Sequence, residues 1–134
     1  MTVGLMIITH NQIGSALLDT AINMLDSCPM PLEIIPVTTG CNPEQLLQQA
    51  KDKLEILSQG DGVIVLTDMY GSTPSNIATR LCNKNNEVAV IAGINLPMLV
   101  RLLNYPNLNL EQLVEKALSG GQDGILLCYD GTGG

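Results

Sequence analysis

The chain has 134 residues, a formal net charge of −7 at pH 7 and 46% hydrophobic residues, with no Phe and no Trp. This length predicts a single domain over residues 1–134 with an aliphatic core. The acidic charge and the scarcity of aromatic side chains argue against binding nucleic acid, because phosphates repel an acidic surface and single-stranded bases stack on aromatic rings.

Membrane insertion and metal binding are also disfavoured. No apolar run approaches the ~20 residues that span a bilayer, and the N-terminus lacks the basic start and cleavage site of a secretory signal. We therefore expect a cytoplasmic protein. Four cysteines without zinc-ligand spacing and a single histidine offer no convergent metal site, and no cofactor is expected.

Strands and helices alternate from the N-terminus onward. The apolar run over 3–9 predicts a buried strand that leads into His10, the only histidine of the chain. Apolar residues at helical spacing predict a helix over 13–27. The next strand, over 32–38, contains Pro36, which has no amide hydrogen and therefore favours the edge of a sheet.

The same alternation continues to the C-terminus. Asn42-Pro43 opens a helix with a buried stripe up to Leu57, and a continuously apolar strand over 63–68 ends at Asp68. The remaining predicted elements are a helix over 74–83, a strand over 87–93, a helix over 96–103, a helix over 110–118 that Gly120-Gly121 breaks, a strand over 124–130 and a flexible tail over 130–134.

This order predicts a doubly wound α/β fold with a mainly parallel sheet of strand order 2-1-3-4. Ligands bind such sheets beyond the carboxyl ends of the strands, where the winding reverses. His10 and Asp68 leave neighbouring strands at that point, so we expect them in one crevice. A carboxylate beside an imidazole fixes its tautomer and stabilises positive charge on the ring, which makes His10 a candidate nucleophile.

A third feature follows Asp68 in the sequence. Thr73 is the predicted N-cap of the next helix and Pro74 its first residue, while Gly71 allows a tight turn. Free amides at this helix start, with the hydroxyls of Ser72 and Thr73, predict a small phosphate-binding site. Imidazole, carboxylate and anion site together favour reversible phosphoryl transfer to histidine, which depends on positioning and charge stabilisation.

Three stretches resemble a known family. They are "IITH" (7–10), "VLTDMYGSTPSNIATRL" (65–81) and "VIAGINLPML" (90–99). The chain resembles, over roughly residues 2–129, the enzyme IIA domain of the mannose-type sugar phosphotransferase system. The resemblance implies that His10 is phosphorylated, that Asp68 is the carboxylate beside it and that Gly71 and Ser72 belong to the phosphate-side loop.

The resemblance also implies partners. The phosphoryl donor would be the phosphocarrier HPr, charged from phosphoenolpyruvate through enzyme I, and the acceptor a IIB component. Family members form homodimers in which the C-terminal strand, here about 124–129, crosses to the partner's sheet. Many members have Gly after the histidine where this chain has Asn11, and acidic residues are common near Gly40-Cys41-Asn42.

Other functions stay open. The chain could regulate other proteins according to its phosphorylation state without serving a transporter, or act as the phosphotransfer subunit of a dihydroxyacetone kinase, although "DMYGSTPSNIA" follows the mannose-type pattern. A flavodoxin-like binding module is a further alternative. It is disfavoured because Asn11-Gln12-Ile13-Gly14 makes a poor phosphate loop and aromatic side chains are almost absent.

Overall fold

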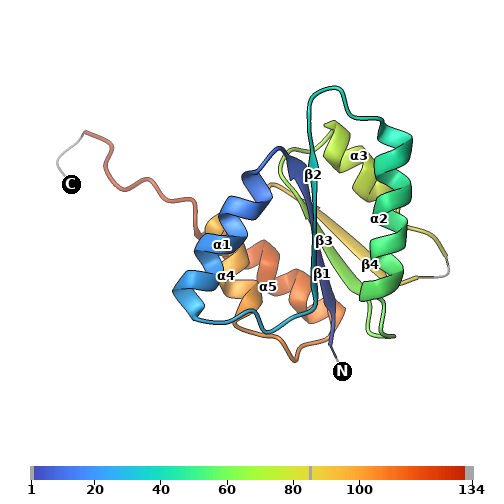
Figure 1. The fold of residues 1–134 in the computed structure, drawn as a ribbon. Coiled ribbons are helices and arrows are strands. Elements are labelled where there is room, and N and C mark those ends of the chain that lie inside the picture. The colour runs from blue at the N-terminus through green and yellow to red at the C-terminus, as the bar shows by residue number, and fades with distance from the viewer. Residues whose placement is uncertain (1, 85, 132–134) are drawn as a thin grey trace.

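The computed structural model describes residues 2–84 and 86–131. Strands and helices alternate along most of this length (Figure 1). In chain order the elements are β1 (Gly4–His10), α1 (Ile13–Leu25), β2 (Leu32–Val37), α2 (Pro43–Leu57), β3 (Val63–Thr67), α3 (Thr73–Thr79), β4 (Val88–Ala92), α4 (Leu96–Leu103) and α5 (Leu110–Asp123). No helix in the described ranges is long and apolar enough to cross a membrane.

The sheet has the predicted strand order. Its four strands lie in the order β2-β1-β3-β4 and all pairs are parallel. Strand β2 lies at one edge of the sheet, next to β1, and Pro36 pairs with Thr9 in the register. Because β2 has a neighbouring strand on one side, the missing amide hydrogen of Pro36 breaks no hydrogen bonds to a strand on the other side. The edge position predicted from this proline is confirmed.

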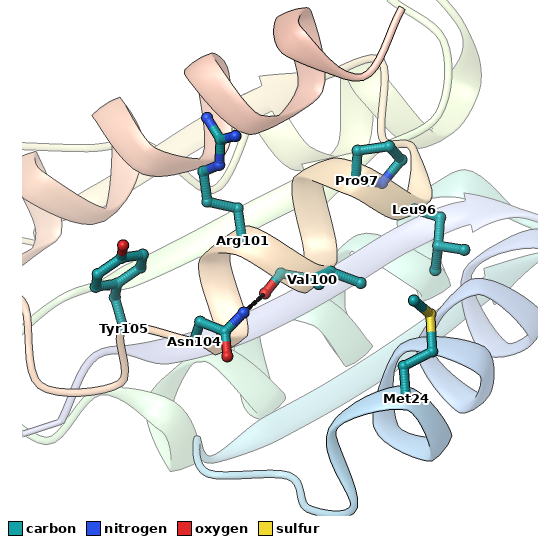
Figure 2. Close-up of a pocket in the computed structure, with 7 residues that line it drawn as sticks. All are labelled: Met24, Leu96, Pro97, Val100, Arg101, Asn104 and Tyr105. Carbon is teal, nitrogen blue, oxygen red and sulfur yellow. Dashed lines mark hydrogen bonds between the residues drawn. The ribbon is translucent and has the colours of Figure 1, made fainter.

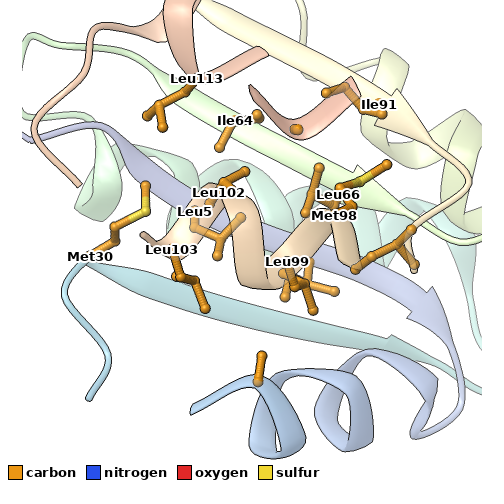
Figure 3. Close-up of a cluster of buried hydrophobic side chains, with 14 of the residues drawn as sticks. Leu5, Met30, Ile64, Leu66, Ile91, Met98, Leu99, Leu102, Leu103 and Leu113 are labelled. Carbon is orange, nitrogen blue, oxygen red and sulfur yellow. The ribbon is translucent and has the colours of Figure 1, made fainter. Parts of the chain in front are cut away.

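Helices cover both faces of the sheet, as the near-continuous apolar strands predict. Helices α2 and α3 pack on one face, while α1, α4 and α5 pack on the other (Figure 1). Alternate residues of β1 enter the two cores, with Leu5 and Ile7 beneath α4 and with Met6 and Ile8 beneath α2 and α3. Figure 3 shows the first of these cores, in which leucines dominate.

Two helix boundaries differ from the prediction. Helix α3 begins at Thr73, with Ser72 as its N-cap, and ends at Thr79, which is earlier than expected. Helix α5 does not break at Gly120-Gly121 but continues to Asp123. A Cβ on Gly120 would lie 2.8 Å from the Cβ of Arg101, so the glycine lets α5 approach α4 closely, and this packing outweighs the low helix propensity of glycine.

The strand predicted over 124–130 is absent from the single chain. These residues leave the end of α5 as an extended segment outside the sheet (Figure 1). The side chains of Ile125, Leu126, Leu127 and Tyr129 are between 72% and 79% exposed. An isolated strand has no partner for its amides and carbonyls, so the segment needs another sheet edge before it can pair. Most of the predicted flexible tail, residues 132–134, lies outside the described residues.

Candidate functional site

Two neighbouring strands deliver an imidazole and a carboxylate to the same edge of the sheet. Strand β1 ends at His10, and Asp68 directly follows β3. Nδ1 of His10 lies 2.8 Å from Oδ2 of Asp68, and the His10 backbone amide donates to the same oxygen at 3.0 Å. The structure thus brings together the two residues that the strand order predicts to meet.

The carboxylate of Asp68 is stabilised in its charged form. Burial alone would raise the pKa of Asp68, but hydrogen bonds donated by the ring and then the backbone amide of His10 outweigh it, so the pKa lies below its usual value of 3.8. The Met69 amide donates to the other carboxylate oxygen at 3.0 Å. Asp68 is therefore ionised at neutral pH and acts only as a hydrogen-bond acceptor.

An ionised Asp68 decides the tautomer of His10. Since the carboxylate can only accept, Nδ1 of the ring must carry the proton that joins the two groups. In the neutral ring this leaves the lone pair on Nε2. The His10 side chain is 39% exposed, while that of Asp68 is 12% exposed. The imidazole is therefore partly accessible, while the group that orients it is largely covered.

A pocket of about 310 Å³ lies beside His10. It opens between the end of β1, the loop from β2 to α2 and the start of α3. Its lining residues are His10, Asn11, Val37, Thr38, Thr39, Gly40, Cys41, Pro43 and Thr73. The parallel register pairs His10 with Val37, which explains why the chain after β2 forms one side of the pocket.

Of the three predicted phosphate-binding residues, the structure places only Thr73 in this pocket. The Gly71 amide donates to Oγ of Ser75 at 3.3 Å, and the Ser72 hydroxyl donates to the Met69 carbonyl at 2.6 Å. These bonds shape the loop between β3 and α3. Contact of Gly71 or Ser72 with a phosphoryl group stays a prediction.

Thr38 and Thr39, which form one side of the pocket, were not predicted from the sequence. The available signal was the position of both residues just after β2, because ligand sites of parallel sheets collect residues from the carboxyl ends of several strands. Cys41 also lines the pocket and is half-buried.

A larger cavity, of about 530 Å³, lies away from this edge between α1 and α4 (Figure 2). Its lining residues are Met24, Leu96, Pro97, Val100, Arg101, Asn104 and Tyr105. None of these is a histidine, a cysteine or a carboxylate, so the cavity lacks the groups that the predicted chemistry requires. Within residues 2–84 and 86–131, no three His, Cys, Asp or Glu side chains gather as a possible metal site.

Known proteins resemble the chain over most of its length. A family model described as PTS system fructose IIA component matches residues 4–118. The mannose-specific EIIAB component of Escherichia coli strain K12 is 33% identical over 127 residues, covering 93% of this chain and 39% of that protein. The chain thus spans about two fifths of that relative. The transcriptional regulatory protein LevR of Bacillus subtilis is 30% identical over 118 residues, which make up 12% of its length.

Solved structures share the fold. The mannose/sorbose specific IIA subunit from Enterococcus faecalis superposes with a TM-score of 0.85 at 21% identity, covering 97% of each chain. A PTS IIA protein associated with the fucose utilization operon of Streptococcus pneumoniae has a TM-score of 0.77 at 26% identity, covering 95% of this chain and 93% of the other. On the family match and the curated relatives, the chain belongs to the mannose-type IIA components of the sugar phosphotransferase system.

Proposed function

We propose that the chain is a phosphohistidine relay in which Nε2 of His10 accepts a phosphoryl group from HPr and passes it to a IIB component. The observation that carries the proposal is the 2.8 Å contact between Nδ1 of His10 and the ionised Asp68. It leaves Nε2 free as the nucleophile and stabilises the positive charge that the ring gains on phosphorylation. Membership of the phosphotransferase system supports the same chemistry, and the relay would act in the cytoplasm.

Residues around the site support docking of a protein donor rather than a small molecule alone. Three large apolar side chains near His10 and Asp68 are exposed, namely Ile13 at 45%, Met69 at 61% and Tyr70 at 81%. Exposed apolar side chains grouped at a reactive residue are typical of a transient protein interface. Gly71, Ser72 and Thr73 are proposed to lie on the phosphate side, with Thr73 nearest to the pocket.

The test is phosphorylation of the purified chain by phosphoenolpyruvate, enzyme I and HPr, followed by intact-mass measurement. We expect the mass of one phosphoryl group to appear and to be lost in acid, because the P–N bond of phosphohistidine is acid-labile. His10→Ala removes the only imidazole of the chain and should abolish the gain. Phosphate that persists in this variant, or none on the unmodified chain, would contradict the relay.

A regulatory role is the second candidate, and the similarity to part of LevR favours it. Here the phosphorylation state of His10 would control binding to another protein. The two roles differ in the fate of the phosphoryl group. Transfer from the phosphorylated chain to a purified IIB component supports the transport relay. A partner that binds the phosphorylated chain but not His10→Ala, without accepting phosphate, supports regulation.

We also propose a homodimer in which residues 124–129 of each chain pair with β4 of the other. Strand β4 is at the edge of the sheet, and within residues 2–84 and 86–131 it pairs with β3 alone. A groove along this edge is lined by Asn86, Glu87, Val88, Ala89, Leu110, Glu111, Val114 and Glu115. The exposed apolar segment after α5 would cover this edge on a second copy.

A further inference from the structure

The direction of the free nitrogen follows from the strand order. The two nitrogens of an imidazole lie on different sides of the ring, and Nδ1 of His10 is held by Asp68 after β3. Because β1 lies between β2 and β3 and Asp68 holds Nδ1 from the β3 side, we expect Nε2 to lie on the side of the chain that follows β2. The pocket beside His10 is consistent with this direction, since Val37 to Cys41 form much of its lining and Asp68 does not line it, although Thr73 of α3 does.

The segment on that side is a tight turn. The Cys41 amide donates to the Thr38 carbonyl at 3.2 Å, and Gly40 has a positive φ of 80°, which favours glycine there. The Asn11 amide donates to the Val37 carbonyl at 3.0 Å, which ties the start of the turn to the residue after His10. The turn is therefore held in a defined position relative to the imidazole.

The threonines of the pocket have hydroxyls available for a ligand. Thr38, Thr39 and Thr73 are exposed and line the pocket, and in the described part of the chain no protein group is hydrogen-bonded to their hydroxyls. The nearby helix α2 cannot replace them, because its amides of Glu44 and Gln45 already donate to Oδ1 of Asn42.

We infer that the hydroxyls of Thr38 and Thr39, opposite Thr73, bind the phosphoryl oxygens during transfer at Nε2 of His10. This inference rests on the proposed relay and assigns it a second binding side, formed by the β2–α2 turn. In the reaction, the Nε2 lone pair forms a new P–N bond while the donor's P–N bond breaks and its electron pair stays on the donor nitrogen. The ring keeps its Nδ1 proton, and its positive charge faces Asp68. The threonine hydroxyls then donate hydrogen bonds to the negatively charged oxygens of the phosphoryl group while it is transferred.

The test uses phosphoramidate, a small phosphoryl donor that needs no docking surface and leaves as ammonia. The variants are Thr38→Val, Thr39→Val and the double variant, which remove hydroxyls at nearly constant volume. We expect each single variant to phosphorylate about tenfold more slowly and the double variant more slowly still. Thr38→Ser and Thr39→Ser keep the hydroxyl and should stay within about twofold of the unmodified chain.

Thr20→Val is the matched control. Thr20 is an exposed threonine on α1, its hydroxyl donates to the Ala16 carbonyl, and it does not line the pocket. Unfolding midpoints of all variants separate a loss of fold from a loss of phosphoryl binding. The inference is overturned if the double valine variant reacts as fast as Thr20→Val, or if the serine variants are as slow as the valine variants.

The same variants separate this inference from the relay itself. With HPr as donor, the unmodified chain and the double variant could be phosphorylated at the same rate. That result would support the relay and contradict a role of the two threonines in binding the phosphoryl oxygens. A chain that accepts phosphate from phosphoramidate with the predicted threonine dependence, but none from HPr, would support the binding side and reject the relay.

Discussion

Asn11 shows how one backbone angle constrains the residue beside the nucleophile. Its φ is +47°, in the left-handed region that glycine and asparagine adopt most readily. Many members of the family have Gly at this position. Both residues satisfy the same turn between β1 and α1, so this departure leaves the position of His10 intact.

Asp68 is expected to contribute pH-dependent stability. Its pKa is lowered in the folded chain, so its contribution is fully present above its ordinary value of 3.8 and is lost as the pH falls through the lower, folded pKa. Asp68→Asn should reduce the free energy of unfolding by roughly 1–3 kcal/mol at neutral pH, because hydrogen bonds to a charged acceptor are lost. The difference from the unmodified chain should shrink in acid.

Denaturant unfolding of both proteins between neutral pH and acid measures this difference, and a gap that stays constant into strong acid would contradict it. The same variant should slow phosphorylation of His10 because its side chain no longer carries the charge that stabilises the ring. Unchanged transfer kinetics would remove Asp68 from the proposed reaction.

The sequence could predict that His10 and Asp68 meet, because both follow apolar runs whose order in a parallel sheet is governed by general rules. It could not reveal the roles open to Thr38 and Thr39. Hydroxyl residues in a turn carry no periodic signal, and their place in the pocket beside His10 depends on how the chain after β2 folds back toward the end of β1. The N-cap was likewise displaced by one residue, to Ser72, whose hydroxyl makes no capping bond and instead donates to the Met69 carbonyl, a loop contact that capping propensity does not predict.

At the scale of elements, α5 shows that tertiary packing can outweigh local helix propensity. Glycine lowers helix propensity, so Gly120-Gly121 predicted an end to the helix. The structure instead uses both glycines where α5 crosses α4, a tertiary contact that no local pattern contains. The existence and order of the elements were predictable from periodicity, whereas this boundary depended on a neighbouring helix.

The two glycines should respond differently to alanine. A Cβ at position 120 would lie 2.8 Å from the Cβ of Arg101, close to the α4 backbone. At position 121 its one close contact would be the flexible end of Met98, at 2.9 Å, and its other neighbours would lie at ordinary van der Waals distance. We expect Gly120→Ala to destabilise the chain by about 1–3 kcal/mol through overpacking. Gly121→Ala should be neutral or gain up to about 1 kcal/mol from helix propensity.

Chemical denaturation of the two variants measures this contrast, with each variant serving as the other's control. Equal effects of the two substitutions would mean that the close approach at Arg101 does not limit the packing of α5 on α4.

At the scale of the whole molecule, the exposed segment after α5 and the open edge of β4 predict the oligomeric state. The full chain should form a dimer, and a chain ending at Asp123 should be monomeric because it lacks the segment proposed to pair with β4 of a second copy. Light scattering coupled to size-exclusion chromatography measures both masses. A truncated chain that stays dimeric would place the interface elsewhere.

The hydrogen bond between Asp68 and Nδ1 of His10 limits how many phosphoryl groups the proposed relay can carry. With a single free ring nitrogen, the chain carries one phosphoryl group at a time. The phosphoryl donor and the phosphoryl acceptor must therefore bind the same face at different times. At steady state the occupied fraction of chains equals the loading rate constant divided by the sum of the loading and unloading rate constants, each taken at the prevailing partner concentrations. The phosphorylated fraction of the chain therefore reports how fast donors supply phosphoryl groups relative to how fast acceptors remove them, whichever protein binds the chain.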